Sequence, residues 1–416
     1  METVCAFANT RGGVLEIGKN DAGEIVGLSN IKELLDVIPK KIFNTMTINA
    51  DVSVHNENNK QYISIDVMQH PFPIAYRGKY YGRSGSNTIE LTGNGLSELM
   101  LRAQGKTWDG VPTLNISADD LSGNAYKTFR KKALNSKRLN KDDIEISNDA
   151  LLENLELKEN GFIKRAATMC FGENPEKWVT GAYIKIGYFD NDVDLRYQDE
   201  VHGPLIEMAD KTLDLLYTKY FKGIIHYEGI QRVENFPVPY EAMRETVLNA
   251  IVHSDYSHFN PIRIRVYEDK AIITNMAKLP EHISFEELLT AHKSCPHNPN
   301  IARVFYRSGQ IESWGRGISK IKTECKNDGK PEPQFSNHAI FFEVKFDFAD
   351  INEDINLETR EILDLMRDNK NISIPKLAEI TGLTGKQVEY KISILKKKGL
   401  IERVGARKNG TWIVKI

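Results

Sequence analysis

The stretch Tyr240-Glu-Ala-Met-Arg-Glu-Thr-Val-Leu-Asn-Ala-Ile-Val-His-Ser-Asp-Tyr256 decides how the centre of the chain folds. Glu245, Asn249 and His253 recur every fourth residue, so they cover about 80° of a helix and form one polar stripe. The residues roughly opposite are apolar and predict a helix that lies on a sheet: Met243, Val247, Ala250 and Ile251. Buried polar groups need partners. The stripe is therefore either a ligand site or a set of structural hydrogen bonds.

Segments that alternate between apolar and polar residues surround this helix and predict strands. Residues 182–188 and 261–267 alternate with period two, and the second segment continues after a turn into 271–274. Helical periodicity also extends over about 205–220. We therefore expect residues 161–348 to form one α/β domain.

The regions on either side predict three further parts. Residues 1–108 combine a hairpin pattern with short helices and indicate a second α/β domain. Residues 109–160 are polar and helical, which is typical of a connection between two cores. Residues 357–416 follow an acidic linker and form a small C-terminal module. The fold class predicted is an α/β (α+β) multidomain protein.

Composition excludes several classes of protein. The 416 residues suggest two or three domains, and 41% hydrophobic with 27% charged residues argues against global disorder. No apolar run reaches the roughly 18–20 residues of a membrane span, and no secretory signal is visible. The four cysteines lie far apart without a CxxC pair, which excludes a disulfide scaffold and a zinc finger. We expect reduced thiols, a cytoplasmic location and no membrane partner.

Charge is distributed unevenly along the chain. The net charge is −2, yet residues 355–416 carry 13 Lys and Arg against seven Asp and Glu, a net +6. A small basic module on an acidic body is typical of a nucleic-acid contact. A solvated Lys-rich surface would give the same count.

The C-terminal module predicts a winged helix-turn-helix. Ser373 can cap a helix that stops at Gly382, and Thr384 can cap a third helix over 385–398. A strand, a basic tip over 405–410 and a second strand follow. The third helix and the tip offer side chains to the major groove and phosphates of double-stranded DNA: Lys386, Gln387, Tyr390, Lys391, Arg407 and Lys408. The alternative is a winged helix used for protein contact or dimerisation.

The Glu-x-x-x-Asn helix resembles the N-box helix of the GHKL ATPase superfamily, which includes DNA gyrase, heat-shock chaperones and histidine kinases. In that superfamily the Asn holds magnesium on the nucleotide phosphates, and in the ATPases the Glu orients water as a general base. The resemblance implies these roles for Asn249 and Glu245. We also expect His253, next along the same stripe, to bind the nucleotide. Gly315-Arg316-Gly317 resembles the glycine-rich loop that opens a helix and binds phosphate.

One motif departs from that superfamily. Its adenine-binding box is Asp-x-Gly-x-Gly, whereas this chain has Asn275-Met-Ala277 after the corresponding strand. An Asn still accepts a hydrogen bond from adenine through its carbonyl oxygen, but it carries no charge. ATP and magnesium remain the predicted ligands. Binding is favoured over turnover, which would be that of a weak ATPase.

Four motifs together support a narrower resemblance. They are Cys5-Ala-Phe-Ala-Asn-Thr-Arg-Gly-Gly, Tyr81-Gly-Arg-Ser-Gly-Ser, Asn249-Ala-x-x-His-x-Asp-Tyr and Ile311-Glu-Ser-Trp-Gly-Arg-Gly-Ile. The chain resembles bacterial and archaeal proteins with a Schlafen AlbA-like N-terminal domain, a divergent GHKL-like domain and a C-terminal winged helix. Such proteins are described as transcriptional regulators or as ATP-dependent DNA helicases related to RecG.

Two activities linked to this resemblance are not expected. Helicase activity needs a GxxxxGK[ST] phosphate loop, which the sequence lacks. A Schlafen nuclease needs a carboxylate cluster. The chain starts too late for the first two Glu of that cluster, and Asn20 replaces a later acid, so that Asp21 alone remains. We expect an N-terminally incomplete domain without nuclease activity.

The sequence therefore predicts a DNA-binding transcriptional regulator with a GHKL-like domain that binds ATP. A winged helix commonly reads two half-sites as a dimer, so a homodimer or higher homo-oligomer is expected. Two alternatives stay open. One is a magnesium-dependent GHKL-type ATPase with Glu245 as the catalytic base, and the other is a nucleotide-free interaction scaffold.

Overall fold

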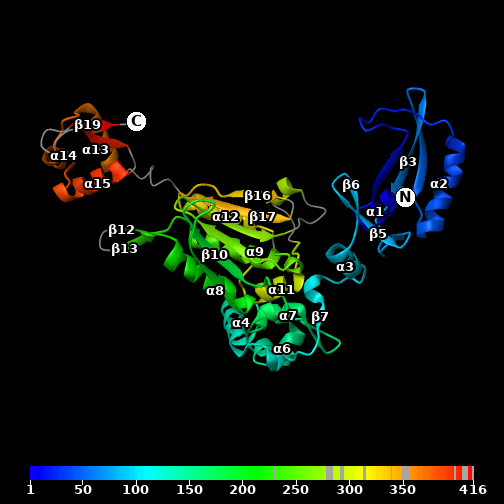
Figure 1. Ribbon diagram of the computed structural model, residues 1–416. Coiled ribbons are helices and arrows are strands. Elements are labelled where there is room, and N and C mark those ends of the chain that lie inside the picture. The colour runs from blue at the N-terminus through cyan, green and yellow to red at the C-terminus, as the bar shows by residue number, and fades with distance from the viewer. Residues whose placement is uncertain are drawn as a thin grey trace.

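The computed structural model describes residues 1–228, 231–277, 284–290, 295–312, 315–338, 340–348, 357–397, 400–404 and 411–414 (Figure 1). Within these ranges, buried apolar side chains form an N-terminal, a central and a C-terminal cluster. No helix in this part of the chain is long and apolar enough to cross a lipid bilayer.

The N-terminal region contains three helices and six strands. They are α1 (Glu2–Asn9), β1 (Gly13–Ile17), α2 (Ile31–Met46), β2 (Asp51–Glu57), β3 (Lys60–Val67), β4 (Ala75–Tyr76), β5 (Lys79–Ser84), β6 (Asn87–Glu90) and α3 (Gly93–Ala103). Strands β1, β3 and β2 form one antiparallel sheet in that order, and β2 and β3 are the predicted hairpin. A second antiparallel sheet has the order β4, β5, β6.

The Ala-Asn-Thr-Arg-Gly-Gly segment fixes the end of α1. Asn9 is buried, and its amide donates to the carbonyls of Ile74 at 2.8 Å and Tyr81 at 2.9 Å, while its Oδ1 accepts from the Ile74 amide at 2.8 Å. Gly12 has a φ of 79°, and a Cβ there would lie 2.6 Å from the Val67 carbonyl oxygen. Both residues therefore serve the packing of α1 against β3, β4 and β5.

The segment 109–160, which the sequence predicts to be a helical connection, is part of the central core. Phe129, Leu151 and Leu157 are fully buried in the same apolar cluster as the central sheet. The ring of Phe129 packs edge-on against that of Phe171, outside this segment, and the local polarity of the segment gave no sign of such packing. The label η marks a short 3₁₀ or π helix. From residue 108 to residue 177 the elements are η1 (Trp108–Gly110), β7 (Pro112–Thr113), η2 (Ala118–Asp120), α4 (Gly123–Ser136), α5 (Lys141–Ile144), α6 (Asn148–Asn154), β8 (Lys158–Glu159), β9 (Phe162–Lys164), α7 (Arg165–Phe171) and η3 (Pro175–Lys177).

The central region is a mixed sheet with helices on one face. Its elements are β10 (Ile184–Phe189), β11 (Leu195–Val201), α8 (Leu205–Leu215), η4 (Leu216–Tyr220), β12 (Ile224–Glu228), β13 (Gln231–Asn235), α9 (Tyr240–His253), η5 (Tyr256–His258), β14 (Ile262–Val266), β15 (Lys270–Met276), α10 (Phe285–Leu288), α11 (Pro299–Arg307), α12 (Gly317–Asn327), β16 (Gln334–His338) and β17 (Phe341–Asp347). The strand order is β11-β10-β14-β15-β17-β16, and β10 and β14 are parallel while the other pairs are antiparallel.

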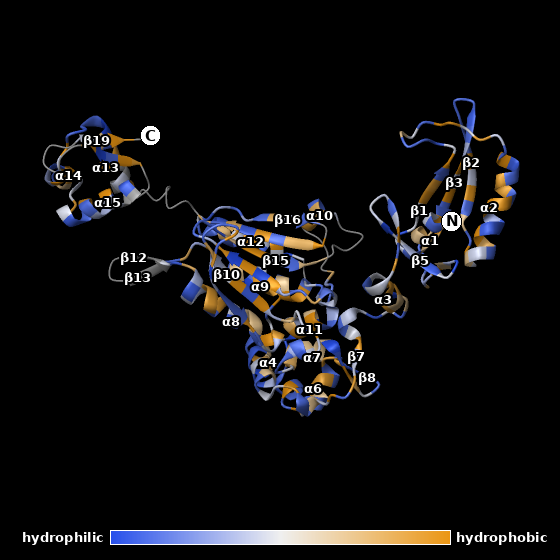
Figure 2. Cartoon of the chain, in the orientation of Figure 1, coloured by the Kyte–Doolittle hydropathy of each residue, from blue (hydrophilic) through white to orange (hydrophobic). Residues whose placement is uncertain are grey.

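Helix α9 occupies the centre of the helical layer. It contacts α8 on one side and α12 on the other, and it lies against β15 (Figure 1). Met243, Val247 and Ile251 are buried, as the apolar face of the helix predicts, and Figure 2 shows apolar residues gathered where the helices and the sheet meet. Asn298 caps the C-terminal end, because its Nδ2 donates to the carbonyls of Val252 at 2.9 Å and Ser254 at 2.8 Å. The C-terminal end of the polar stripe is thereby held in place.

The C-terminal region folds as a winged helix-turn-helix. It consists of α13 (Leu357–Asp368), α14 (Ile374–Thr381), α15 (Gly385–Lys397), β18 (Ile401–Val404) and β19 (Thr411–Val414), with the two strands paired antiparallel. The predicted caps are confirmed: Ser373 Oγ accepts from the Lys376 amide at 3.4 Å, and Gly382 has a φ of 69°. Val388, Ile392 and Leu395 of α15 are buried against Trp412 and the other helices.

Candidate functional site

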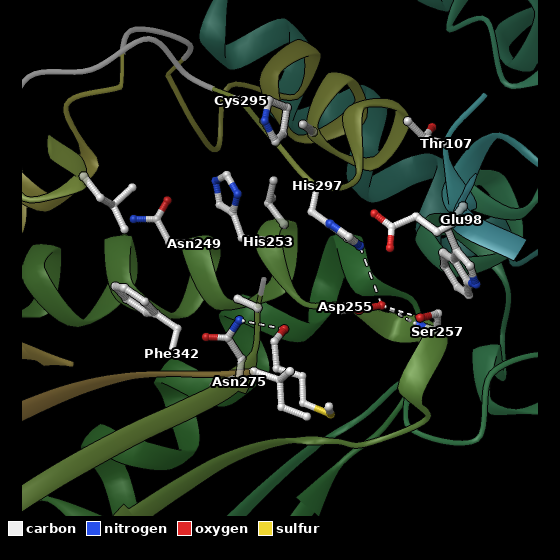
Figure 3. Close-up of a pocket in the computed structure, with 18 of the residues that line it drawn as sticks. Glu98, Thr107, Asn249, His253, Asp255, Ser257, Asn275, Cys295, His297 and Phe342 are labelled. Atoms are coloured by element: carbon white, nitrogen blue, oxygen red, sulfur yellow. Dashed lines mark hydrogen bonds and ion pairs between the residues drawn. The ribbon is translucent and has the colours of Figure 1, made fainter. Parts of the chain in front are cut away.

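A cavity of about 1830 Å³ runs along the polar stripe of α9 and extends past α3 to Arg83 of β5. Figure 3 shows Asn249 and His253 projecting from that helix toward the cavity, above Asn275 and Phe342. Small-ligand pockets usually measure about 300–1,000 Å³, so this space is large enough for a nucleotide. The residues assigned from sequence to nucleotide binding or catalysis all line it: Glu245, Asn249, His253, Asn275, Gly315, Arg316 and Gly317.

The carboxylate of Glu245 is buried and has two side-chain partners. Its Oε1 accepts from Nδ2 of Asn249 at 3.4 Å, one helical turn further on. Its Oε2 lies 3.4 Å from Nζ of Lys320 on the neighbouring helix α12. With a residue exposure of only 8%, Glu245 would be costly to bury without these partners. Carboxylate and amide oxygens side by side are also the hard ligands that Mg²⁺ prefers.

Helix α12 begins against this pair of residues. Gly315 has a φ of 66°, which glycine adopts readily, and the helix starts two residues later at Gly317. A Cβ at Gly317 would lie 2.8 Å from Nδ2 of Asn249 and 3.0 Å from Oε1 of Glu245. Glycine therefore allows the positive end of the α12 dipole to approach the α9 stripe closely. Ser313 and Trp314, which complete the predicted loop motif, lie outside the described residues.

Asn275 lies at the end of β15, directly opposite Phe342 of β17. It is 4% exposed, and its Nδ2 donates to the Met276 carbonyl at 3.3 Å. Ile273, Phe342 and other apolar side chains line the adjoining wall of the cavity. The site thus combines an amide with an apolar wall at one end and the Glu245–Asn249 pair at the other.

A second polar cluster lies beyond the C-terminal end of α9. Asp255 Oδ1 accepts from the amide of Ser257 at 3.0 Å and from its hydroxyl at 2.6 Å, and Nε2 of His297 lies 3.6 Å away. Asp255 Oδ2 lies 2.9 Å from Nδ1 of His258. Figure 3 shows Glu98 of α3 facing the same group. The carboxylate of Asp255 thus accepts from Ser257 and lies between two histidines, with a second carboxylate facing the group.

These contacts shift two pKa values in opposite directions. Burial by itself would raise the pKa of Asp255, but hydrogen bonds from His297 and Ser257, with the charges of His297 and His258, hold it well below its usual range. The hydrogen bond to Asp255 raises the pKa of His297 above 6.5 against the effect of burial, and the charges of Glu98 and Asp109 act in the same sense. The pair is thus stabilised as an ion pair.

Sequence reasoning missed this cluster. His297 stands alone in the sequence, with no motif around it, whereas the structure places it against Asp255. Asp255 belongs to the motif Asn-Ala-x-x-His-x-Asp-Tyr, so the sequence does place Asp255 next to the end of the stripe. The sequence gives no sign of the pairing with His297, because the two residues are far apart along the chain and α11 brings them together.

The winged helix presents part of the predicted DNA surface. Lys386 and Tyr390 are exposed on α15, and 68% of the surface of Tyr390 is accessible to solvent. Gln387 also has a structural contact, because its Oε1 accepts from the amide of Thr384 at 2.8 Å and from its hydroxyl at 2.7 Å. Its carbonyl oxygen is therefore occupied in a capping box. Lys391 Nζ lies 3.4 Å from the Thr359 hydroxyl, and Arg407 and Lys408 lie outside the described residues.

A family model matches part of each of the three regions. Residues 1–92 match "Schlafen, AlbA_2", residues 260–346 match "Putative ATP-dependent DNA helicase recG C-terminal", and residues 359–402 match "Winged helix-turn-helix DNA-binding". The chain therefore has the architecture that its motifs predict: an AlbA_2-like region, an ATPase-like region and a winged helix-turn-helix, the last of which supports DNA binding.

One solved structure resembles nearly the whole chain at low sequence identity. A crystal structure of the DIP2311 protein from Corynebacterium diphtheriae is similar over 99% of this chain and 85% of that one, at 19% identity and a TM-score of 0.49. No curated protein matches the chain.

The Asp255–His297 pair should make stability depend on pH. A histidine whose pKa is raised by folding stabilises the fold fully below about pH 6.5, and this contribution is lost as the pH rises through the folded-state value. We expect the melting temperature to fall between pH 6 and pH 9 in the wild type, and part of that fall to disappear in His297→Gln. Thermal unfolding across this range measures the effect. The exposed His338→Gln serves as control, and an unchanged profile in His297→Gln would contradict the assignment.

Proposed function

We propose that this chain is a DNA-binding transcriptional regulator whose central domain binds ATP with magnesium. The observation that carries the proposal is the convergence of Glu245, Asn249 and Gly317 on one cavity, in a chain that ends in a winged helix. The amides at the start of α12 would bind phosphate, and Asn249 Oδ1 would be a magnesium ligand shared with it. Asn275 and the apolar wall beside it would hold the base.

The proposed regulation couples nucleotide binding to the position of α12. A phosphate held between the start of α12 and the α9 stripe would favour one arrangement of these two helices over others. In a homodimer, a change of this kind alters how the two winged helices are spaced on DNA. The cytoplasm is where such a regulator would meet both DNA and ATP.

Glu245 favours a second candidate, a magnesium-dependent ATPase. Its carboxylate is buried beside Asn249, where it could accept a proton from a water that attacks the terminal phosphate. A nucleotide-free scaffold is the third reading, and it would make the Glu245–Asn249 contact purely structural.

Nucleotide binding is tested by titrating ATP with magnesium into the full chain by calorimetry. We expect wild type to bind and Asn249→Ala to lose affinity by about tenfold or more, because it removes both the metal ligand and a partner of Glu245. The exposed Asn154→Ala, at the end of α6, is the matched control. Folded wild-type protein without heat of binding would leave the scaffold as the better description.

Turnover is tested separately with Glu245→Gln. This change keeps a hydrogen-bonding side chain of the same size but removes the base, so we expect it to bind ATP and to release phosphate no faster than background. Phosphate release by the wild type above this variant would support the ATPase. Equal rates in both proteins would exclude it.

DNA binding is tested with Lys386→Ala in α15. A lysine that contacts phosphate releases about one counterion, so we expect weaker binding to duplexes of any sequence and a log–log salt slope smaller by about one unit. Fluorescence anisotropy over a salt series measures both. Lys376→Ala removes a lysine that is paired with Glu379 on α14 and should leave the slope unchanged. The same slope in all three proteins would favour the protein-contact role of the winged helix.

A further inference from the structure

Helix α12 carries a lysine that faces the stripe of α9. Lys320 lies one turn after Gly317, and its backbone amide donates to the Arg316 carbonyl at 2.9 Å. Its Nζ lies 3.4 Å from Oε2 of Glu245 and 3.7 Å from Oε2 of Glu241. The side chain lines the cavity with 36% of its surface exposed. An ammonium group is thereby placed within contact distance of the predicted general base.

The lysine of this ion pair can exchange its carboxylate partners for a phosphate at little cost in free energy. Each of its carboxylate partners carries one negative charge, and a half-exposed lysine gains little free energy from such a contact. The lysine stem is flexible, and its ammonium is a compact charge with three donors. A terminal phosphate carries more negative charge than a carboxylate and offers several acceptor oxygens, so it would compete successfully for the same ammonium.

The neighbouring cation of the loop is directed elsewhere. The guanidinium of Arg316 lies 3.1 Å from Glu312, and the side chain is 66% exposed. Lys322, further along α12, has its Nζ 3.0 Å from Glu332 and stacks over the ring of Phe335. Of these three cations of the described part of α12 and its loop, Lys320 is the one in contact with Glu245.

We infer that Lys320 binds the terminal phosphate of a nucleoside triphosphate and so makes the site prefer triphosphate to diphosphate. The inference rests on the proposed nucleotide binding and adds the residue that reads the third phosphate. A water activated by Glu245 must lie next to the terminal phosphorus, so an ammonium 3.4 Å from that carboxylate can reach the same phosphoryl group. The first two phosphates remain with Asn249 and the start of α12.

The test compares ATP and ADP affinities of the full chain, with magnesium, by calorimetry. We expect Lys320→Met to weaken ATP binding by about tenfold or more and ADP binding by less than about threefold, because one charge-assisted contact is lost only with ATP. Lys320→Arg should restore most of the preference, and Lys322→Met should leave both affinities unchanged. Circular dichroism of each variant establishes that it is folded.

The outcomes separate this inference from the function it rests on. If wild type binds both nucleotides and Lys320→Met binds ATP as tightly as wild type does, the inference fails while nucleotide binding stands. Equal weakening of ATP and ADP also overturns it, because Lys320 would then contact a phosphate that both ligands share. A wild-type chain that binds neither nucleotide overturns the proposed function and this inference together.

Discussion

The close approach of Gly317 to Glu245 and Asn249 is the constraint on which the central site depends. The start of α12 lies so close to the polar stripe of α9 that a Cβ at position 317 would meet the Asn249 and Glu245 side chains within 3.0 Å. That contact brings the backbone amides of one helix and the carboxylate of the other to one wall of the cavity. Replacing the glycine by a residue with a Cβ would force the helices apart or displace the two polar side chains.

The other end of α9 is fixed by polar contacts that radiate from a single buried carboxylate. Asp109 accepts from the amides of Asn300 at 2.7 Å and Ile301 at 3.0 Å, and so holds the start of α11. That start carries Asn298, which caps α9, and His297, which pairs with Asp255. A residue from the segment 109–160 therefore positions the cavity, which explains physically why this segment belongs to the central core.

Local signals account for what the sequence predicted correctly. The helix 240–253 was predicted from its periodicity, and the caps at Ser373 and Gly382 follow from residue types that favour those backbone positions. Contacts between distant segments carry no such signal. The packing of 109–160 and the Asp255–His297 pair are of this kind. Gln387 differs from these cases, since the same exposed position suits both a base contact and a capping box, and the structure shows the capping box with Thr384.

Because position 275 carries a neutral amide, the contacts to phosphate would contribute more to binding in the proposed site than the contact to the base. A neutral Asn costs less to bury than the carboxylate it replaces, so this wall is stable without a ligand to satisfy a charge. The same substitution removes the charge that would strengthen a bond to the base. In the proposed site, binding would then depend more on the charged groups around Glu245, where Asn249, Lys320 and the start of α12 meet. Such a site would select for phosphate number more strongly than for the identity of the base.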